Sequence, residues 1–141
     1  MTRLVIDASV WVAALDASDE FSAPSRAFLD AATRQRVSLE IPAHAPIEIA
    51  CALARRLGNA RVARELGGNL VRMPGIRLHA LTAELLERAG FLGTESMLRS
   101  GDAIYAALAQ QIEARVITWD GDLHDRAEGV TPTEWMATEA G

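Results

Sequence analysis

The apolar positions of the chain alternate between short runs and longer segments with helical spacing. Residues 3–6 form a run with β-branched side chains that is typical of a buried strand, and residues 37–41 alternate apolar and polar side chains. Residues 75–81 and 115–118 are two further strand-like segments. Helices are predicted within residues 10–15, 22–35, 46–58, 60–71, 82–92 and 100–114, followed by a turn and a short helix over 119–127.

This alternation of strands with helices predicts an α/β fold. Parallel strands joined by right-handed crossovers carry helices on both faces of the sheet. We therefore expect a three-layer α/β/α sandwich with a mostly parallel central sheet. The 141 residues contain no repeat and no linker-like segment, and half of them are apolar. We expect residues 1–141 to form a single domain.

Composition narrows the classes of function. The net charge is −5 and all 14 basic residues are Arg, so there is no broad basic surface for nucleic acid and no catalytic Lys. No apolar run reaches the roughly 18 residues of a membrane span, and Asp7 interrupts the amino-terminal apolar segment before a signal-peptide core is complete. These features predict a cytoplasmic protein that does not enter a membrane. The single cysteine, Cys51, excludes an intrachain disulfide, and we expect it to be a small core residue.

Four carboxylates fall at one edge of the predicted sheet. Asp7 ends the first strand, and Glu48 lies in the opening turn of the helix that follows the second. Asp102 lies in the first turn of the helix that starts at residue 100, and Asp120 follows the last strand. In a parallel sheet, strand ends and the starts of the following helices share the edge where ligands bind. Taken singly, each acid is also explained by a helix cap, a helix dipole or a turn.

Together, the four acids predict a metal site. Carboxylates within a few ångströms of one another repel unless a cation neutralises them. Oxygen ligands without Cys or His at ligand spacing favour Mg²⁺ or Mn²⁺ over zinc. We expect His44, His79 and His124 to be solvated or capping residues. Phosphodiester hydrolysis is the natural use of such a site, because the cation activates water and offsets phosphate charge.

Four segments carry a resemblance to a known family: VIDASVW, PIEIACAL, SGDAIYAALA and VITWDGDL. In order and context they resemble the acidic motifs of PIN-domain nucleases, and most closely those of the VapC-type toxins of bacterial toxin–antitoxin pairs. The resemblance extends from the first strand to the closing GVTPTEW. Each segment is short, but the ordered set in a chain of this length is specific.

The resemblance implies roles for particular residues and partners. It implies an endoribonuclease toxin that uses Mg²⁺ or Mn²⁺ to cleave RNA, a cognate antitoxin protein that blocks the site, and a homodimer. Three acids would form the core of the metal site, a fourth would complete it, and two hydroxyl residues would support it. The core acids are Asp7, Glu48 and Asp102, and the fourth acid is Asp120. Asp122 could share or replace the role of Asp120, and the supporting residues are Ser9 and Thr118.

Other surface features leave alternatives open. We expect Trp11 and Trp119 to pack rather than to stack on RNA. The apolar stripe in residues 10–15 either joins the core or, with residues 27–32, forms a groove for an antitoxin helix. Four arginines either contact phosphates or form a solvated helical face that pairs with acids. They are Arg55, Arg56, Arg61 and Arg64.

Competing α/β families fit less well. A haloacid-dehalogenase-like phosphatase needs D-x-D, whereas Ser9 stands two positions after Asp7, and both this class and phosphorelay receivers need a Lys. A dinucleotide-binding domain would show G-x-G-x-x-G after the first strand, where the chain has no glycine. The remaining alternative is a PIN-like binding module without catalysis, and the mutual repulsion of the intact acids argues against it.

Overall fold

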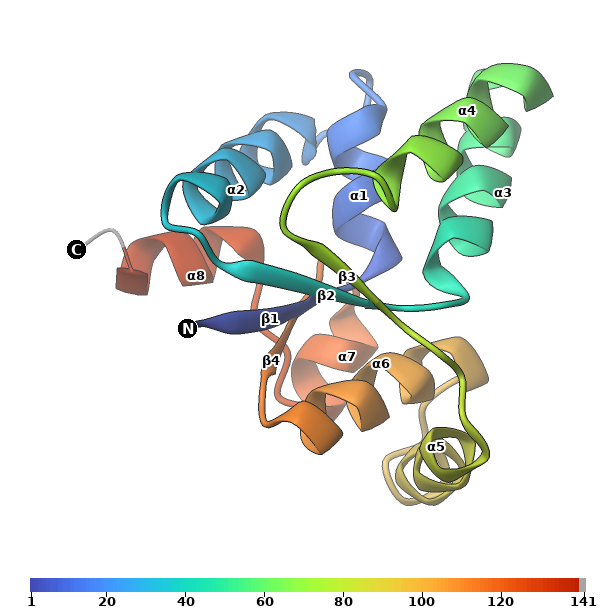
Figure 1. The fold of residues 1–141 in the computed structure, drawn as a ribbon, viewed down its shortest axis with the longest axis vertical. Helices are drawn as coiled ribbons and strands as arrows, with labels where there is room; N and C mark the ends of the chain where they lie inside the picture. The colour runs from blue at the N-terminus through green and yellow to red at the C-terminus, as the bar shows by residue number, and fades with distance from the viewer. Residues whose placement is uncertain (140–141) are drawn as a thin grey trace.

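Four short parallel strands form the centre of the molecule (Figure 1). The computed structural model describes residues 1–139. The strands are β1 (Arg3–Ile6), β2 (Ser38–Pro42), β3 (Ile76–His79) and β4 (Arg115–Ile117). Their order in the sheet is β3-β2-β1-β4, and each neighbouring pair is parallel. Three of them lie within the segments that the apolar pattern predicted, and β2 extends one residue beyond the predicted 37–41, to Pro42.

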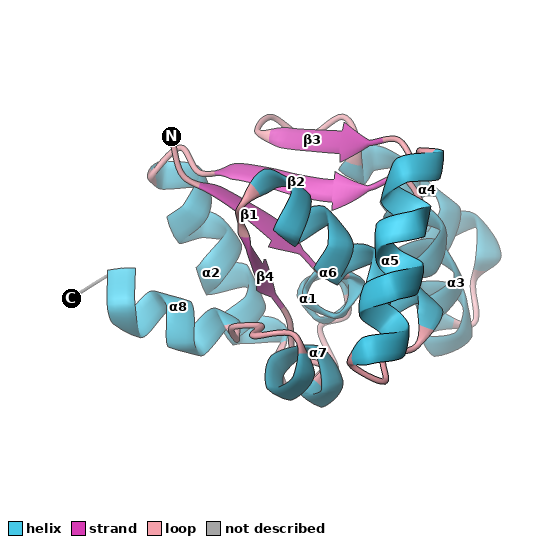
Figure 2. Cartoon of the chain, turned by 90° about the horizontal axis from the view of Figure 1, so that it is seen from below, coloured by secondary structure: helices cyan, strands magenta, loops and turns pink. Residues whose placement is uncertain are grey.

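Helices cover both faces of this sheet. They are α1 (Ala8–Leu15), α2 (Ser22–Arg34), α3 (Ala45–Leu57), α4 (Ala60–Leu70), α5 (Ala83–Glu95), α6 (Ser100–Ile112), α7 (Gly121–Arg126) and α8 (Pro132–Glu139). Helices α1 to α4 lie on one side of the sheet and α5 and α6 on the other (Figure 1), and Figure 2 shows β1, β2 and β3 running in the same direction. The expected three-layer α/β/α sandwich is confirmed. Within residues 1–139, no helix combines the length and apolarity needed to cross a membrane.

The centre of the sheet is buried on both faces. The last three residues of β1 are buried in succession, as expected for a parallel strand that helices cover on both sides. Trp11 of α1 is only 2% exposed, so it packs in the core as predicted. Trp135 of α8 meets Phe28 of α2 edge to face, with ring centroids 5.2 Å apart. Aromatic packing therefore attaches the last helix to the layer that contains α2.

The expectation that Cys51 is a core residue is wrong, because its side chain is exposed. The buried stripe of α3 consists of Ala45, Ile49 and Leu53, which recur every four positions. Cys51 lies two positions after Ile49, which turns its side chain about 200° around the helix and away from the core. Helix α3 stops at Gly58 as predicted, and this glycine adopts a left-handed conformation with a φ of 65°.

A buried acid inside the sheet was missed by the sequence analysis. The side chain of Glu40 on β2 is fully buried, and Arg3 donates to its Oε1 at 3.1 Å. His79 Nε2 lies 2.9 Å from the same oxygen, and the Ser38 hydroxyl donates to the other. Burial acts to raise the pKa of Glu40, but these hydrogen bonds outweigh it and hold the pKa below its usual 4.5. The carboxylate thus links β1 to β3 across β2, and His79 is not the solvated or capping residue that we expected.

We expect Glu40→Ala to lower the free energy of unfolding by about 3–5 kcal/mol, because Arg3 and His79 lose their buried partner. Glu40→Gln keeps the shape and an acceptor, so it should cost less. Since folding lowers the pKa of Glu40, its stabilising contribution is present above pH 4.5 and is lost as the pH falls further. Urea unfolding at neutral and acid pH measures both effects. The exposed Glu65→Ala serves as control, and equal losses for Glu40 and Glu65 would contradict the assignment.

Candidate metal centre

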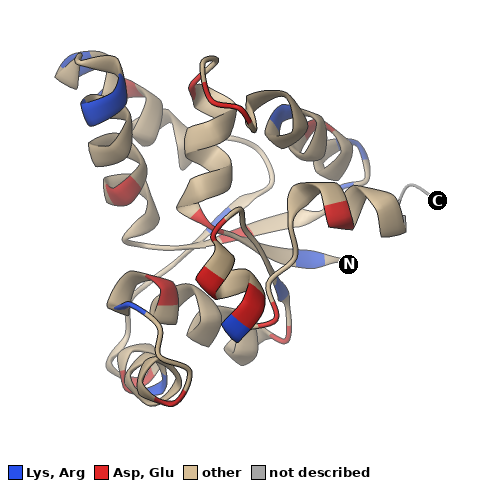
Figure 3. Cartoon of the chain, turned by 180° about the vertical axis from the view of Figure 1, so that it is seen from behind, with Lys and Arg blue, Asp and Glu red and all other residues tan. Residues whose placement is uncertain are grey.

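The candidate acids lie where strands end and helices begin. Asp7 is the N-cap residue of α1, and its backbone N–H donates to the carbonyl of Ile117 at the end of β4 at 3.0 Å. Asp120 is the N-cap residue of α7, while Glu48 and Asp102 lie in the first turns of α3 and α6. Figure 3 shows acidic segments of separate elements near the middle of the molecule, between the two helical layers. The structure therefore places all four acids at the carboxyl edge of the sheet.

Asp7 is held rigidly in a buried position. Asp7 is only 5% exposed, and its Oδ2 accepts hydrogen bonds from the hydroxyls of Ser9 at 2.7 Å and Thr118 at 2.8 Å. Burial raises the pKa of Asp7, the two hydroxyls oppose this rise, and the charge of Glu48 adds to it. Ser9 thus contacts the acid beside which it was expected. Thr118, expected as a supporting residue next to Asp120, donates to Asp7 and also accepts the backbone N–H of Asp120 at 2.9 Å.

Asp102 is the acid whose charge is least compensated. Its Oδ2 is buried and accepts no hydrogen bond from the described residues, and the nearest cation is Arg99 Nε at 3.5 Å. Burial, the largest cause, acts together with the charges of Asp120, Asp7 and Glu48 to raise the pKa of Asp102 to about 6, against the opposing charge of Arg99. Because the charges of all three other acids raise the pKa of this carboxyl, the four acids are electrostatically coupled.

Glu48 approaches the start of α6 and is oriented from there. The Tyr105 hydroxyl donates to Glu48 Oε1 at 2.7 Å, and burial raises the pKa of Tyr105, so this hydroxyl stays protonated. A Cβ atom added at Gly101 would lie 3.1 Å from Glu48 Oε2, which is tighter than most real contacts. The glycine therefore lets the Glu48 carboxylate come close to the helix that carries Asp102.

Sequence analysis missed Tyr105 and misjudged His44. Tyr105 lies three positions after Asp102, on the same face of α6, and this spacing within an apolar stretch is the signal that identifies it. His44 is the N-cap residue of α3, but its side chain makes no cap. Its Nε2 lies 3.2 Å from Glu48 Oε1, although neither ring nitrogen has hydrogen-bond geometry to any partner in the described chain.

The structure separates Asp120 from Asp122. Asp120 Oδ2 accepts the backbone N–H of Leu123 at 2.9 Å and caps α7, while Oδ1 faces Arg99 at 3.5 Å. Asp122 is more exposed, with 44% of its side-chain area accessible against 25% for Asp120, and it pairs with Arg126 at 3.7 Å. Asp120 also acts on the pKa of Asp102. Asp120 therefore belongs to the acidic group, and Asp122 points toward another partner.

The oxygen atoms of these acids suit a hard divalent cation. One carboxylate oxygen of Asp102 is buried and has no hydrogen-bond partner within residues 1–139. In Asp7 and in Glu48, hydroxyl groups donate to one carboxylate oxygen, and the second oxygen accepts no side-chain hydrogen bond from the same residues. No three His, Cys, Asp or Glu side chains in that part of the chain already surround a common point. Mg²⁺ generally takes one or two carboxylates directly and completes its shell with water. The donor set therefore fits Mg²⁺ or Mn²⁺ with few direct protein ligands.

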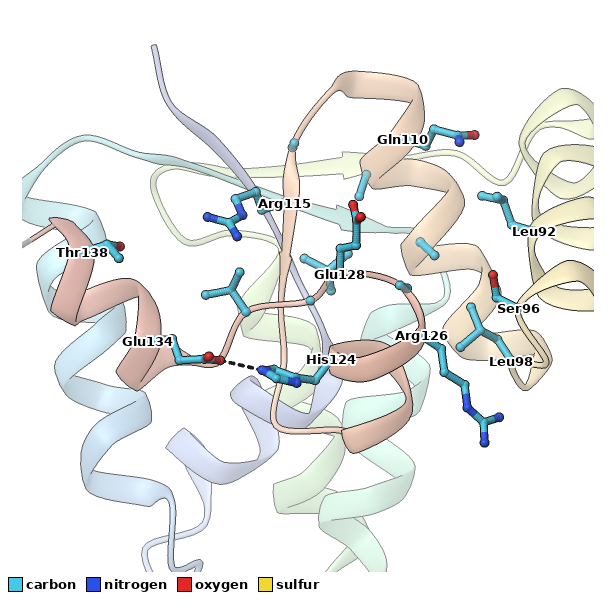
Figure 4. A pocket seen from close by; sticks show the side chains of 17 residues that line it. Leu92, Ser96, Leu98, Gln110, Arg115, His124, Arg126, Glu128, Glu134 and Thr138 are labelled. Carbon is cyan, nitrogen blue, oxygen red and sulfur yellow. Dashed lines mark hydrogen bonds and ion pairs between the residues drawn. The ribbon is translucent and has the colours of Figure 1, made fainter.

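A pocket of about 880 Å³ lies elsewhere, between α6, β4, α7 and α8 (Figure 4). Its lining includes Arg115, His124 and Glu134 but none of the four acids. His124 Nε2 lies 2.7 Å from Glu134 Oε1, and its Nδ1 lies 2.8 Å from Asp125, so this partly exposed histidine is paired with two acids. The chemistry of the carboxylates, not the size of this hollow, identifies the candidate site.

The arginine-rich region remains largely exposed. Arg56 binds Asp16 at 3.1 Å and Asp19 at 2.5 Å, and so ties α3 to the loop between α1 and α2. The other three arginines of the group are exposed, and no ion pair joins the group to Glu65 within residues 1–139. The structure therefore shows a solvated helical face in which Arg56 pairs with acids of the neighbouring loop and not with Glu65.

Known proteins resemble this chain in sequence family and in fold. The family model for the PIN domain matches residues 4–129. A comparison with curated protein sequences found no match. Twenty chains of solved structures match. The three described next are 11–21% identical to this chain in sequence, a level that shows similarity of fold.

The VapC20 toxin of Mycobacterium tuberculosis, described as cleaving the sarcin–ricin loop, has a TM-score of 0.75 and 21% identity, and the match covers 86% of this chain and 92% of that chain. A toxin–antitoxin complex from Klebsiella pneumoniae gives a TM-score of 0.65 and 20% identity, over 92% of this chain and 97% of that one. VapBC2 from Rickettsia felis, bound to a DNA fragment from its promoter, gives a TM-score of 0.70 and 11% identity over the same shares.

The raised pKa of Asp102 makes a prediction about stability. Because its pKa is about 6 in the folded protein and 3.8 is its ordinary value, the metal-free protein should lose stability as the pH rises from 4 to 6. Asp102→Asn removes this loss and should raise the free energy of unfolding at neutral pH by up to about 3 kcal/mol. Urea unfolding with chelator at several pH values measures it. Asp122→Asn is the control, and an equal change of slope in both variants would argue against the assignment.

Proposed function

The chain belongs to the PIN-domain family, and we propose that it is an endoribonuclease toxin that hydrolyses RNA phosphodiester bonds with Mg²⁺ or Mn²⁺. The observation that carries this proposal is the acidic edge. There the charges of Asp7 and Glu48 raise the pKa of Asp102, and one Asp102 oxygen is buried without a partner in the described residues. A protein has little reason to concentrate uncompensated carboxylates at one place unless a cation joins them.

The residues that would hold the cation are Asp7, Glu48 and Asp102, with Asp120 as the fourth acid. A bound divalent cation supplies an activated water at neutral pH and offsets the charge that develops on the phosphate. The protein contributes orientation. Ser9 and Thr118 hold Oδ2 of Asp7, Tyr105 holds Oε1 of Glu48, and the N-terminus of α7 holds Oδ2 of Asp120. Each acid thus keeps a defined direction despite the repulsion of its neighbours.

The likeness in fold to VapC20 and to toxin–antitoxin complexes supports the toxin assignment. We propose that residues 1–141 form a single nuclease domain, that the protein is a cytoplasmic homodimer, and that a cognate antitoxin protein blocks the site. Of the apolar stripe on α1, Val10 and Trp11 are buried in the core. Of this stripe, the partly buried Ala14 and Leu15 remain to contact an antitoxin helix.

The second candidate function is a PIN-like binding module without catalysis. The pairing of Arg99 with both Asp102 and Asp120 favours it, because an arginine between two carboxylates reduces their need for a metal. Arg99 is 76% exposed and both contacts are 3.5 Å long, so its compensation of buried charge is weak. The endoribonuclease remains the better supported function.

We expect the purified protein to cleave RNA only with Mg²⁺ or Mn²⁺, and a chelator to abolish cleavage. Asp7→Asn and Asp102→Asn should each lower kcat/KM about a hundredfold or more, since each removes a charge that holds the cation. Calorimetry with Mn²⁺ should show weaker binding to the same variants. Asp122→Asn is the matched control and should keep cleavage. Metal-independent cleavage, or activity in the Asp7→Asn, Asp102→Asn double variant, would contradict the proposal.

Induction of the chain in bacteria should arrest growth if it is a toxin. The arrest should disappear with Asp102→Asn, because cleavage depends on that carboxylate, and co-expression of the small protein encoded beside it should relieve the arrest. Growth curves and a pull-down of the two proteins measure these effects. Normal growth on induction of an RNA-cleaving protein would separate a housekeeping nuclease from a toxin.

A further inference from the structure

Two aromatic rings stack beside the candidate metal centre. Phe21, the N-cap residue of α2, lies against Trp119 with ring centroids 4.2 Å apart and an interplanar angle of 11°. Trp119 directly precedes Asp120 in the chain, and its backbone N–H donates to Ser9 Oγ at 3.0 Å. Ser9 in turn donates to Asp7. The stacked pair is therefore attached to the residues that form the acidic edge.

The protein holds both rings in fixed orientations. Trp119 Nε1 donates to the hydroxyl of Ser25, which is fully buried, at 2.8 Å. The backbone N–H of Phe21 donates to Asp19 Oδ1 at 2.7 Å, and Arg56 binds the other oxygen of Asp19. The Trp119 ring and the backbone of Phe21 are thus anchored, and the Phe21 ring is ordered by stacking on Trp119, which reduces the entropy lost on binding.

Phe21 is the outer ring of the pair. Trp119 packs against the hydrophobic core, as the sequence analysis expected, whereas Phe21 is 37% exposed. Trp119 covers one face of the Phe21 ring, so a ligand can reach only the remaining surface of this partly exposed residue. A fixed aromatic ring with an accessible face is the type of surface on which nucleobases stack.

We propose that Phe21 is a stacking platform for an unpaired nucleobase of the RNA, beside the phosphate that enters the metal centre. This inference rests on the proposed ribonuclease function and adds a substrate contact to it. The acidic edge repels the phosphates next to the cleaved one, so a neutral ring provides affinity that charge does not. Because Trp119 and Asp120 are neighbours in the chain, the stacked base belongs to a nucleotide next to the cleaved bond. The stacked base must be unpaired, because bases inside a duplex have no open face.

The test combines protein variants with RNAs that lack a single base. In an Asp102→Asn background that stops cleavage, fluorescence anisotropy measures the binding of single-stranded RNAs of about 12 nucleotides, each with one base removed. Phe21→Leu keeps an apolar contact for Trp119 but removes the aromatic face, and it should weaken binding of the intact RNA about tenfold. Phe21→Tyr keeps the ring and should restore binding. Removal of the stacked base should weaken binding to the same extent as Phe21→Leu.

The combination of both changes separates stacking from a structural role. If Phe21 stacks on that base, the combination of Phe21→Leu with the RNA that lacks the base should weaken binding no more than either change alone. Both changes remove the same contact. Losses that add at every RNA position mean that Phe21 only supports the fold, and they overturn the proposal. Phe91→Leu on α5, which alters another exposed Phe, is the matched control and should leave RNA binding unchanged. Thermal unfolding of each variant confirms that it is folded.

The remaining outcomes distinguish this proposal from the one on which it rests. Metal-dependent cleavage with the same KM in Phe21→Leu overturns the platform alone. If the unsubstituted protein neither binds nor cleaves RNA, the proposed function fails and the platform fails with it. If Phe21→Leu leaves RNA binding unchanged but weakens binding of a protein partner, the ring belongs to a protein interface and the nucleobase proposal is overturned.

Discussion

Electrostatic repulsion among carboxylates at the carboxyl edge of the sheet is the constraint on which the rest of this structure depends. The parallel topology brings Asp7, Glu48, Asp102 and Asp120 to that edge, and nothing in the backbone separates their charges again. The surrounding residues limit the cost of this repulsion by hydrogen bonds and by helix N-termini, yet the pKa of Asp102 still rises to about 6. The raised pKa of Asp102 means that its ionised carboxylate lowers the stability of the fold at neutral pH, and the proposed function accounts for this cost by a bound cation.

The contrast with Glu40 shows how the proposed metal-binding acids differ from an acid with a structural role. Both Glu40 and Asp102 carry buried oxygen atoms, but Glu40 receives hydrogen bonds from Arg3, Ser38 and His79 and its pKa falls below the usual value. Asp102 keeps an oxygen without a partner, and its pKa rises. A compensated buried charge holds strands together, whereas an uncompensated one is available to a ligand. The proposed metal centre rests on this difference, and burial alone would not have revealed it.

The acids could be predicted because each has a fixed place in the alternation of strand and helix. An acid after a strand, or in the first turn of the next helix, must lie at the ligand-binding edge of a parallel sheet. The pattern did not distinguish Asp120 from Asp122, since both follow the same strand and only packing shows which faces Asp102. It also missed Tyr105 and Glu40, whose roles depend on partners from other elements. Cys51 was misplaced because the apolar pattern favoured the face of α3 that carries Ile47, Ala50, Cys51 and Ala54. The buried face instead carries Ala45, Ile49 and Leu53.

The sequence by itself determined the class of fold, the order of its elements from β1 to α7 and the edge at which the acids gather, because these follow from local periodicity and from the geometry of parallel strands. Tertiary structure alone decided which carboxylate oxygens are held and which are left without partners, and which hydroxyls orient them. It also decided that Phe21 lies against Trp119, although 98 positions of chain number separate them. Hydrogen bonds and ring contacts act over a few ångströms between residues that are distant in the chain, and the order of residues does not encode those distances directly.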